Sequence, residues 1–172
     1  MLSLRPLVAA DLPVIQPWFD DEETRHWLGG RDWPVKGLRL SGAGRHELLA
    51  IADGAPIGMV DVEIEHRRAA FAVVIAPHAR RKGLGKQMVE ACIAVPAFAD
   101  VEEWFAGVER GNTASRQLLE GLGFLRMTDE DADGFTYFAR RRSGWADSPW
   151  RPYGRQGQTR VGLLRKLGST TG

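Results

Sequence analysis

Hydrophobic and polar residues alternate or repeat along this chain in a pattern that predicts a mixed α/β fold. Alternating or continuous apolar stretches bounded by turn residues favour strands, and apolar residues at helical spacing favour helices. We expect strands at residues 2–7, 47–52, 57–66, 69–75, 101–108, 124–127 and 135–138. We expect helices at 11–19, 20–28, 83–94 and 112–121, with 29–45 mostly loop and at most one helical turn. Strands at both ends with strand–helix–strand units between them indicate a mixed sheet.

Two adjacent strands of this pattern differ in how much of their surface we expect to be buried. Strand 57–66 has apolar residues on one face and Asp61, Glu63 and Glu65 on the other, because strand side chains alternate. The run 69–75 contains no polar residue, which is typical of a central strand buried on both faces. The second strand is therefore expected in the middle of the sheet.

Composition adds limits on the class of protein. The chain has 172 residues and a mass of 19.0 kDa, with 44% hydrophobic and 26% charged residues, as in ordinary globular domains. No apolar run approaches the roughly 20 residues that a membrane span needs. Cys92 is the only cysteine, which excludes a disulfide framework and a thiolate zinc site, and the four histidines lack metal-ligand spacing. We expect a cytoplasmic protein without a metal or a membrane partner.

Charge is distributed unevenly and suggests a boundary near Arg141. Residues 140–172 hold eight basic residues and one acidic residue, whereas residues 1–139 carry 15 basic and 21 acidic residues. We divide the chain into a domain over 1–141 and a basic, aromatic extension over 142–172. The density of aromatic residues in the extension favours docking onto the acidic body or onto a partner subunit, and a homodimer is therefore one of the expected alternatives. An RNA-binding arm is the alternative, weakened by the lack of contiguous basic runs after Arg142.

The segment from Val73 to Lys86 carries the clearest chemistry. A buried strand leads into three consecutive cations, Arg80 to Lys82, and then into a helix that begins with Gly83-Leu84-Gly85. Glycine lets the backbone approach a ligand closely, and the first turn of a helix presents unpaired N–H groups and a positive dipole end. This combination predicts a phosphate-binding turn. The spacing matches neither a mononucleotide P-loop nor a dinucleotide fingerprint.

Arg80-x-x-Gly83-x-Gly85 after a buried strand resembles the acetyl-CoA signature of the GNAT family of N-acetyltransferases. A second segment, Asn112-x-x-Ser115 followed by Leu118-Leu119 and Gly123-Phe124, is similar to another segment of that family. The resemblance covers roughly residues 2–141. It implies the GNAT fold: a twisted, mostly antiparallel mixed sheet of about seven strands, with helices on both faces and central strands splayed at the cofactor site.

The resemblance also implies acetyl transfer from acetyl-CoA to an amine, and a set of cofactor-binding residues. The pyrophosphate would contact the loop, the pantetheine arm would pair with the strand before it, and Asn112 and Ser115 would approach the pantetheine and the sulfur. The set consists of Val73, Val74, Ile75, Arg80, Arg81, Lys82, Gly83, Leu84, Gly85, Lys86, Asn112 and Ser115.

The general base cannot be carried over from the family, because the family's usual positions hold other residues here. The tyrosine that many members use as general acid is Leu119, and two positions that often carry carboxylates are Ala70 and Gly107. The remaining catalytic candidates are Glu63, Asp61 and Glu109, with Ser115 or solvent as the proton donor to the leaving thiolate. The alternative for the carboxylates of strand 57–66 is a solvated strand face.

The acceptor is expected to be a primary amine of a cationic molecule, because the body of the chain is acidic. The N-terminal stretch resembles the aminoglycoside 6′-N-acetyltransferases and the ribosomal-protein N-terminal acetyltransferases. Candidate acceptor-binding residues are Trp27, Trp33, Glu63 and Glu65. We expect an aminoglycoside-like or polyamine-like small molecule. A peptide N-terminus and a non-catalytic acetyl-CoA-binding sensor or scaffold are the alternatives, and the pattern argues against nucleic acid.

Overall fold

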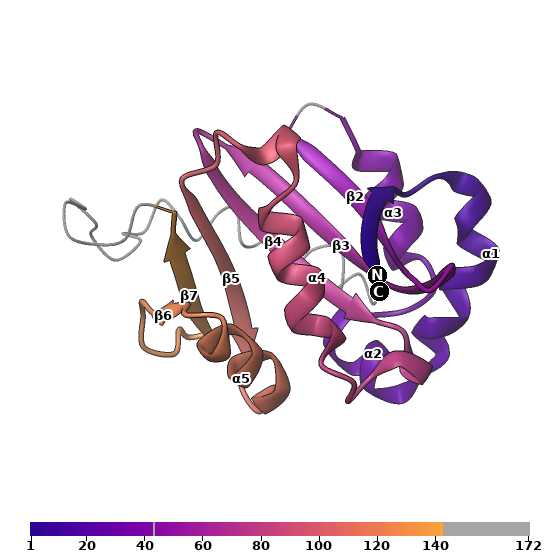
Figure 1. Ribbon diagram of the computed structural model, residues 1–172. Coiled ribbons are helices and arrows are strands. Elements are labelled where there is room, and N and C mark those ends of the chain that lie inside the picture. Colours follow the sequence, from indigo (N-terminus) through magenta and orange to yellow (C-terminus); the bar gives the residue numbers. More distant parts are fainter. Residues whose placement is uncertain (43, 143–172) are drawn as a thin grey trace.

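The computed structural model describes residues 1–42 and 44–142, and the extension expected beyond Arg142 lies outside the described residues. Within them the chain forms a seven-stranded sheet with the order β1-β2-β3-β4-β5-β7-β6 (Figure 1). The strands are β1 (Leu2–Pro6), β2 (Arg45–Ala52), β3 (Ala55–Glu65), β4 (Arg68–Ile75), β5 (Glu103–Glu109), β6 (Leu125–Arg126) and β7 (Phe135–Arg141). The predicted mixed sheet of about seven strands is confirmed.

The pairing of β4 with β5 differs from the rest of the sheet. It is the parallel pair, and all other neighbours are antiparallel. Its ladder contains only Arg68 to Ala70 opposite Glu103 to Phe105, whereas β4 continues to Ile75 and β5 to Glu109. Figure 1 shows the two strands separating beyond this short ladder. The expected splay of the central strands is therefore present.

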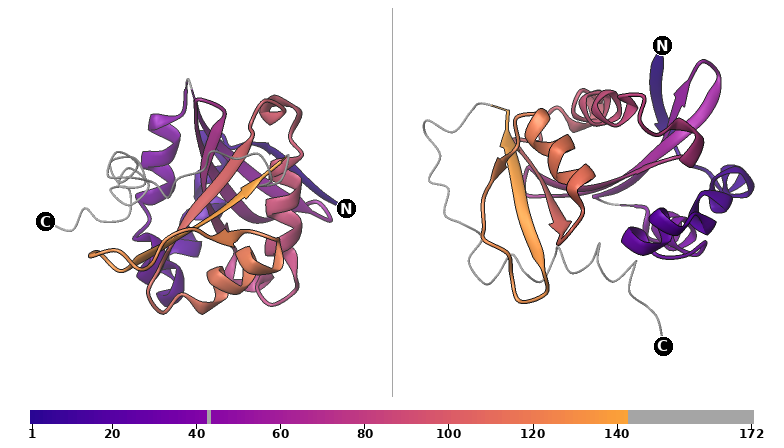
Figure 2. Two further views of the ribbon diagram at one scale, coloured as in Figure 1. Left: turned by 90° about the vertical axis from the view of Figure 1, so that its left-hand side faces the viewer. Right: turned by 90° about the horizontal axis from the view of Figure 1, so that it is seen from below.

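Helices cover both faces of the sheet, as expected. One face carries α4 (Leu84–Ile93) and α5 (Thr113–Gly121), and the other carries α1 (Leu12–Ile15), α2 (Glu22–Leu28) and α3 (Trp33–Leu40) (Figure 2). An apolar core lies between the layers: Phe19 stacks on Trp33, and Phe71 packs edge-on against Trp104. No helix in the described ranges is long and apolar enough to cross a membrane.

Two expectations about the N-terminal helices were wrong in detail. The helix predicted at 11–19 is short α1 flanked by 3-10 turns at Ala9–Asp11 and Gln16–Asp20. Pro17 has no N–H to continue the α-helical hydrogen bonds, which explains why α1 stops at Ile15. The loop expected at 29–45 contains the eight-residue α3, with Pro34 in its first turn, where a missing N–H costs nothing.

Candidate functional site

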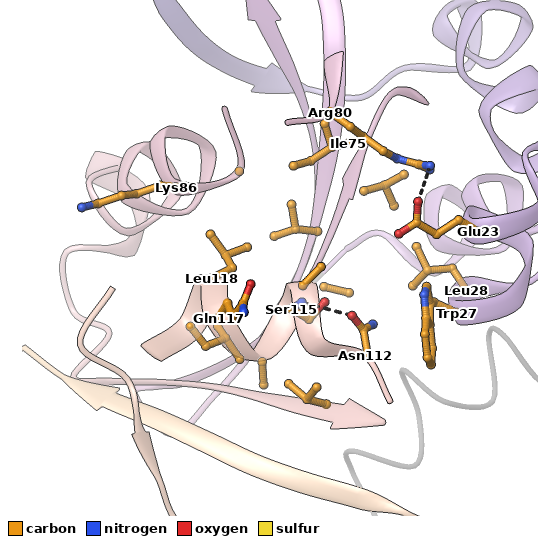
Figure 3. A pocket seen from close by; sticks show the side chains of 18 of the residues that line it. Glu23, Trp27, Leu28, Ile75, Arg80, Lys86, Asn112, Ser115, Gln117 and Leu118 are labelled. Atoms are coloured by element: carbon orange, nitrogen blue, oxygen red, sulfur yellow. Dashed lines mark hydrogen bonds and ion pairs between the residues drawn. The ribbon is translucent and has the colours of Figure 1, made fainter. Parts of the chain in front are cut away.

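The separation of β4 from β5 opens a cavity of about 740 Å³ that runs between the sheet and three helices. Beyond the short ladder, the facing backbone edges of the two strands have no β partner in each other. The cavity is lined by residues from both strands, from the turn before α4, from α5 and from α2 (Figure 3). These include Phe71 to Ile75 of β4 and Ala106 to Glu109 of β5. The second half of β4 is thus half-open on the cavity side instead of buried on both faces.

The turn before α4 has the backbone geometry of an anion-binding loop. Arg81 and Gly83 adopt left-handed conformations, with φ of 60° and 71°, and Gly83 is the N-cap of α4. Gly83 has no side chain with which to cap the helix, so the first N–H groups of α4 are not capped by their N-cap residue and can bind a ligand. Gly85 is buried against β4, and a Cβ there would lie 2.8 Å from Cδ1 of Ile75. Any larger residue at this position would force the end of the Ile75 side chain to shift.

Three cations of this turn are available to an anion. Arg81, Lys82 and Lys86 make no ion pair with the other residues that the structure describes, and Arg81 and Lys86 line the cavity. Free cations beside uncapped helix N–H groups fit a pyrophosphate. The unpaired edge of β4 from Val73 to Ile75 fits the amide groups of an extended pantetheine arm. The residues present therefore fit coenzyme A.

Arg80 has a different surrounding from its neighbours. Its guanidinium donates to Oδ2 of Asp21 at 2.7 Å and to Oε2 of Glu23 at 2.8 Å, and it also contacts Oγ1 of Thr24. Arg80 lines the cavity, but its charge is committed to the beginning of α2 (Figure 3). The contacts of this side chain are with protein carboxylates, and its expected cofactor-binding role stays a prediction.

Asn112 and Ser115 meet at the first turn of α5, where both line the cavity. Oδ1 of Asn112 accepts a hydrogen bond from the Ser115 backbone N–H at 3.0 Å, which makes Asn112 the N-cap of α5. Leu119, at the family's tyrosine position, is 3% exposed and carries no proton to donate. Ser115 is therefore the hydroxyl that the first two turns of α5 bring to the cavity beside Asn112.

The four candidate carboxylates are separated by the fold. Glu109, at the exposed end of β5, lines the cavity. Asp61, Glu63 and Glu65 of β3 are not among its lining residues, because β4 lies between β3 and the opening. Asp61 is fully buried, and Glu63 and Glu65 are half-buried, so the three do not form the solvated face that was the alternative.

The buried Asp61 belongs to a charged cluster that the sequence did not reveal. The register of β2 and β3 places Glu47 opposite Asp61 and Arg45 opposite Glu63. Arg45 donates to Oδ2 of Asp61 at 2.5 Å, and its Nε lies 3.7 Å from Oε1 of Glu47. A Cβ on Gly37 of α3 would lie 2.1 Å from that same Glu47 oxygen, so α3 closes directly over the cluster.

Burial dominates the protonation of this cluster. It raises the pKa of Glu47 to about 9, helped by the negative charge of Asp61 and opposed by Arg45. Burial also raises the pKa of Asp61 to about 6, with Arg45 as the main opposing influence. At neutral pH Glu47 is therefore neutral and Asp61 is the ionised partner of Arg45.

The two tryptophans proposed for the acceptor site lie in different environments. Trp27 of α2 lines the cavity together with Leu28, and its ring approaches Gly111. Trp33 is 2% exposed and stacks on Phe19 at 5.7 Å between ring centroids, so it belongs to the core and not to the cavity. Helical amphipathicity alone does not distinguish these two positions, because both residues sit on short helices with mixed faces.

Comparison with known proteins supports the family. The model of the acetyltransferase (GNAT) family matches residues 11–124. Among curated proteins, the uncharacterized N-acetyltransferase YfmK of Bacillus subtilis (strain 168) is 32% identical over 128 residues, which cover 73% of this chain and 86% of YfmK.

Solved structures share the fold at low sequence identity. A coenzyme A complex of the aminoglycoside acetyltransferase AAC(6′)-Ib has a TM-score of 0.72 at 20% identity, covering 83% of this chain and 96% of that one. A spermidine N-acetyltransferase from Vibrio cholerae, in complex with CoA and spermine, has a TM-score of 0.70 at 19% identity, with the same coverage. With its family-model match, its relative and the splayed strands beside a basic turn, this chain belongs to the acetyltransferase (GNAT) family.

Proposed function

We propose that the protein transfers an acetyl group from acetyl-CoA to the primary amine of a small cationic molecule, such as an aminoglycoside or a polyamine. The observation that carries this proposal is the two-ended cavity. Lys86 and the uncapped N–H groups of α4 lie at one end, and Trp27 and Asn112 lie at the other (Figure 3), on an opening that Glu109 also lines. A single opening thus has one end suited to phosphates and another suited to an ammonium group.

The first step asked of the chain is to bind and orient the cofactor, which supplies the acetyl thioester when bound. The backbone N–H groups from Arg81 to Lys86, with their three cations, would hold the pyrophosphate. The free edge of β4 from Val73 to Ile75 would hold the pantetheine amides in an extended conformation. The thioester would then lie between the two separated strands, near the first turn of α5.

The second step is to remove a proton from the attacking amine. An amine with a pKa near 10.4 is neutral in only about 1 molecule in 2,500 at pH 7, so a nearby carboxylate is useful. Glu109 is our candidate for this base, because it lines the cavity and makes no ion pair with the residues that the structure describes. The Ser115 hydroxyl is our candidate for returning a proton to the leaving thiolate.

The acceptor class is supported by the aromatic and acidic rim and by the related folds. Kanamycin and spermine are bound in complexes of the two kinds of acetyltransferase with similar folds. Both are polycationic amines, and Trp27 offers a π-face that attracts such cations. Glu109 adds a negative charge on the same opening.

The test is a thiol-release assay with acetyl-CoA across aminoglycosides, polyamines and N-terminal peptides. We expect turnover with at least one polycationic small molecule, and a decrease of kcat by about 10²-fold or more in Glu109→Gln. Glu65→Gln is the matched control outside the cavity and should change kcat far less. Turnover with peptides alone would favour an N-terminal acetyltransferase. Coenzyme A binding without any turnover would favour a sensor or scaffold.

A further inference from the structure

Arg80 joins two parts of the site that are far apart in the sequence. It belongs to the turn that precedes α4, and its partners Asp21, Glu23 and Thr24 lie 56 to 59 residues earlier, at the beginning of α2. The contact is partly buried, since the side chains of Arg80 and Asp21 are 23% and 28% exposed. Charge-assisted hydrogen bonds with this shielding are stronger than surface ion pairs.

Asp21 makes this contact part of the structure of α2 itself. Its Oδ2 accepts from the backbone N–H of Thr24 at 2.9 Å, which caps the helix, and from Arg80 at 2.7 Å. The Thr24 backbone N–H and the Arg80 guanidinium hold the pKa of Asp21 below its usual value. Thr24 is only 3% exposed. The same oxygen thus caps the N-terminus of α2 and anchors it to the turn before α4.

One helical turn beyond this anchor, α2 forms the acceptor end of the cavity with Trp27 and Leu28. Three residues after Arg80 in the sequence, Gly83 begins the turn at the end of the cavity that would bind the phosphates. Arg80 is thus a side chain through which one wall contacts the other, and its charge is already neutralised by two carboxylates. A direct role at the phosphates falls to the cations that have no such partners.

We propose that Arg80 is a positioning residue that couples the two ends of the site, so that coenzyme A binding at the turn before α4 orders α2 and its acceptor-binding residues. This inference rests on the proposed function for the location of the acceptor site. When the turn closes on the phosphates, Arg80 is held in place, and its hydrogen bonds hold the N-terminus of α2. A coupling of this kind is reciprocal, so an ordered α2 also favours the bound turn.

Hydrogen exchange with and without saturating coenzyme A tests this coupling and requires no acceptor. In the wild-type protein we expect coenzyme A to slow exchange in the first turn of α4, and in α2 from Arg25 to Gly29 by about fivefold or more. In Arg80→Ala the protection of α4 should persist while the protection of α2 is lost. Asp21→Asn should behave like Arg80→Ala, because asparagine still caps a helix but carries no charge.

Glu22→Gln is the matched control on the same helix, since Glu22 makes no ion pair with the described residues, and it should keep the protection of α2. Protection of α2 that survives in both Arg80→Ala and Asp21→Asn overturns the inference. So does complete loss of coenzyme A binding in Arg80→Ala, because Arg80 would then act at the phosphates. If coenzyme A slows exchange in α4 but not in α2 of the wild-type protein, the coupling is overturned and the proposed cofactor site stands. If coenzyme A does not slow exchange in α4 either, the proposed cofactor site is overturned as well.

Discussion

The buried pair Glu47 and Asp61 leads to a prediction in which the same isosteric change has opposite effects on two neighbouring carboxyl groups. Glu47 is 3% exposed and protonated at neutral pH, so Glu47→Gln replaces one neutral group by another of the same shape. The new amide N–H can donate to Oδ1 of Asp61, which has no hydrogen-bond partner among the described residues. Asp61→Asn instead removes the charge that Arg45 requires.

The magnitude for Glu47 follows from linkage between protonation and folding. The folded protein keeps a proton on Glu47 up to about pH 9, whereas the unfolded chain loses it near 4.5. The unfolded state therefore binds fewer protons over this window, and stability falls as pH rises, by about 1.36 kcal/mol per pH unit well inside it. Glu47→Gln lacks this titration. The variant should gain about 4 kcal/mol relative to wild type between pH 5 and pH 8.

Urea denaturation of both variants and wild type at pH 5, 6, 7 and 8 measures these differences. Asp61→Asn should lose about 3–5 kcal/mol at pH 8, as expected when one partner of a buried ion pair is removed. Stability curves of wild type and Glu47→Gln that run parallel in pH would show that Glu47 is ionised in the folded protein. That result would refute the assignment of the proton to Glu47.

Four further substitutions separate core packing from the site. Trp33→Ala should cost about 3–5 kcal/mol of stability, because the side chain is buried in the core. Trp27→Ala should instead raise the KM for the acceptor and leave the melting temperature nearly unchanged, because Trp27 lines the cavity. Equal losses of stability in the two variants would contradict the assignment of Trp27 to the cavity. Gly85→Val should weaken coenzyme A binding by about tenfold or more in calorimetry, because the added side chain pushes the end of Ile75, 2.8 Å from the new Cβ, out of place beside the cavity. Unchanged affinity would show that this packing does not support the cofactor site. Gly83→Ala meets no atom but needs φ of 71°, so it should cost about 1 kcal/mol in thermal unfolding, and a clearly more stable variant would contradict the left-handed turn.

The strands could be predicted from the sequence because each carries its own periodicity, whereas α3 could not. The alternation in β3 and the continuous apolar run of β4 are local signals that do not depend on the rest of the fold. In α3, Trp33 and Gly37 face the sheet for reasons that lie elsewhere: an aromatic stack with Phe19 and the space taken by the Glu47 side chain. Such reasons are tertiary, and no pattern of 11 to 18 residues contains them.

The sequence could single out the turn before α4 as a candidate phosphate site because the residues of that turn are contiguous. The charged cluster could not be predicted, because its residues are spread over two strands. Gly83 and Gly85 and the cations beside them occupy one short segment. Glu47 meets Asp61 only in the observed register of β2 and β3, and a slip by one residue would turn Glu47 to the opposite face. The partners of Arg80 could not be predicted for the same reason. An arginine in this turn indicates an anionic partner, but the sequence does not show whether that partner is a phosphate or, as in the structure, two carboxylates.

The acidic character of residues 1–139 favoured a cationic acceptor, and the structure changes the reason for that preference. Asp21 and Glu23 are neutralised by Arg80, and Glu47 carries a proton, so these acids contribute little field at the cavity. Glu109 lines the opening without an ion-pair partner among the described residues. Under the proposed function, attraction of an ammonium group would therefore depend on Glu109 at this opening more than on the net charge of the body. We therefore expect the shape of the cavity and the charge of Glu109 to select the amine acceptor of the proposed function.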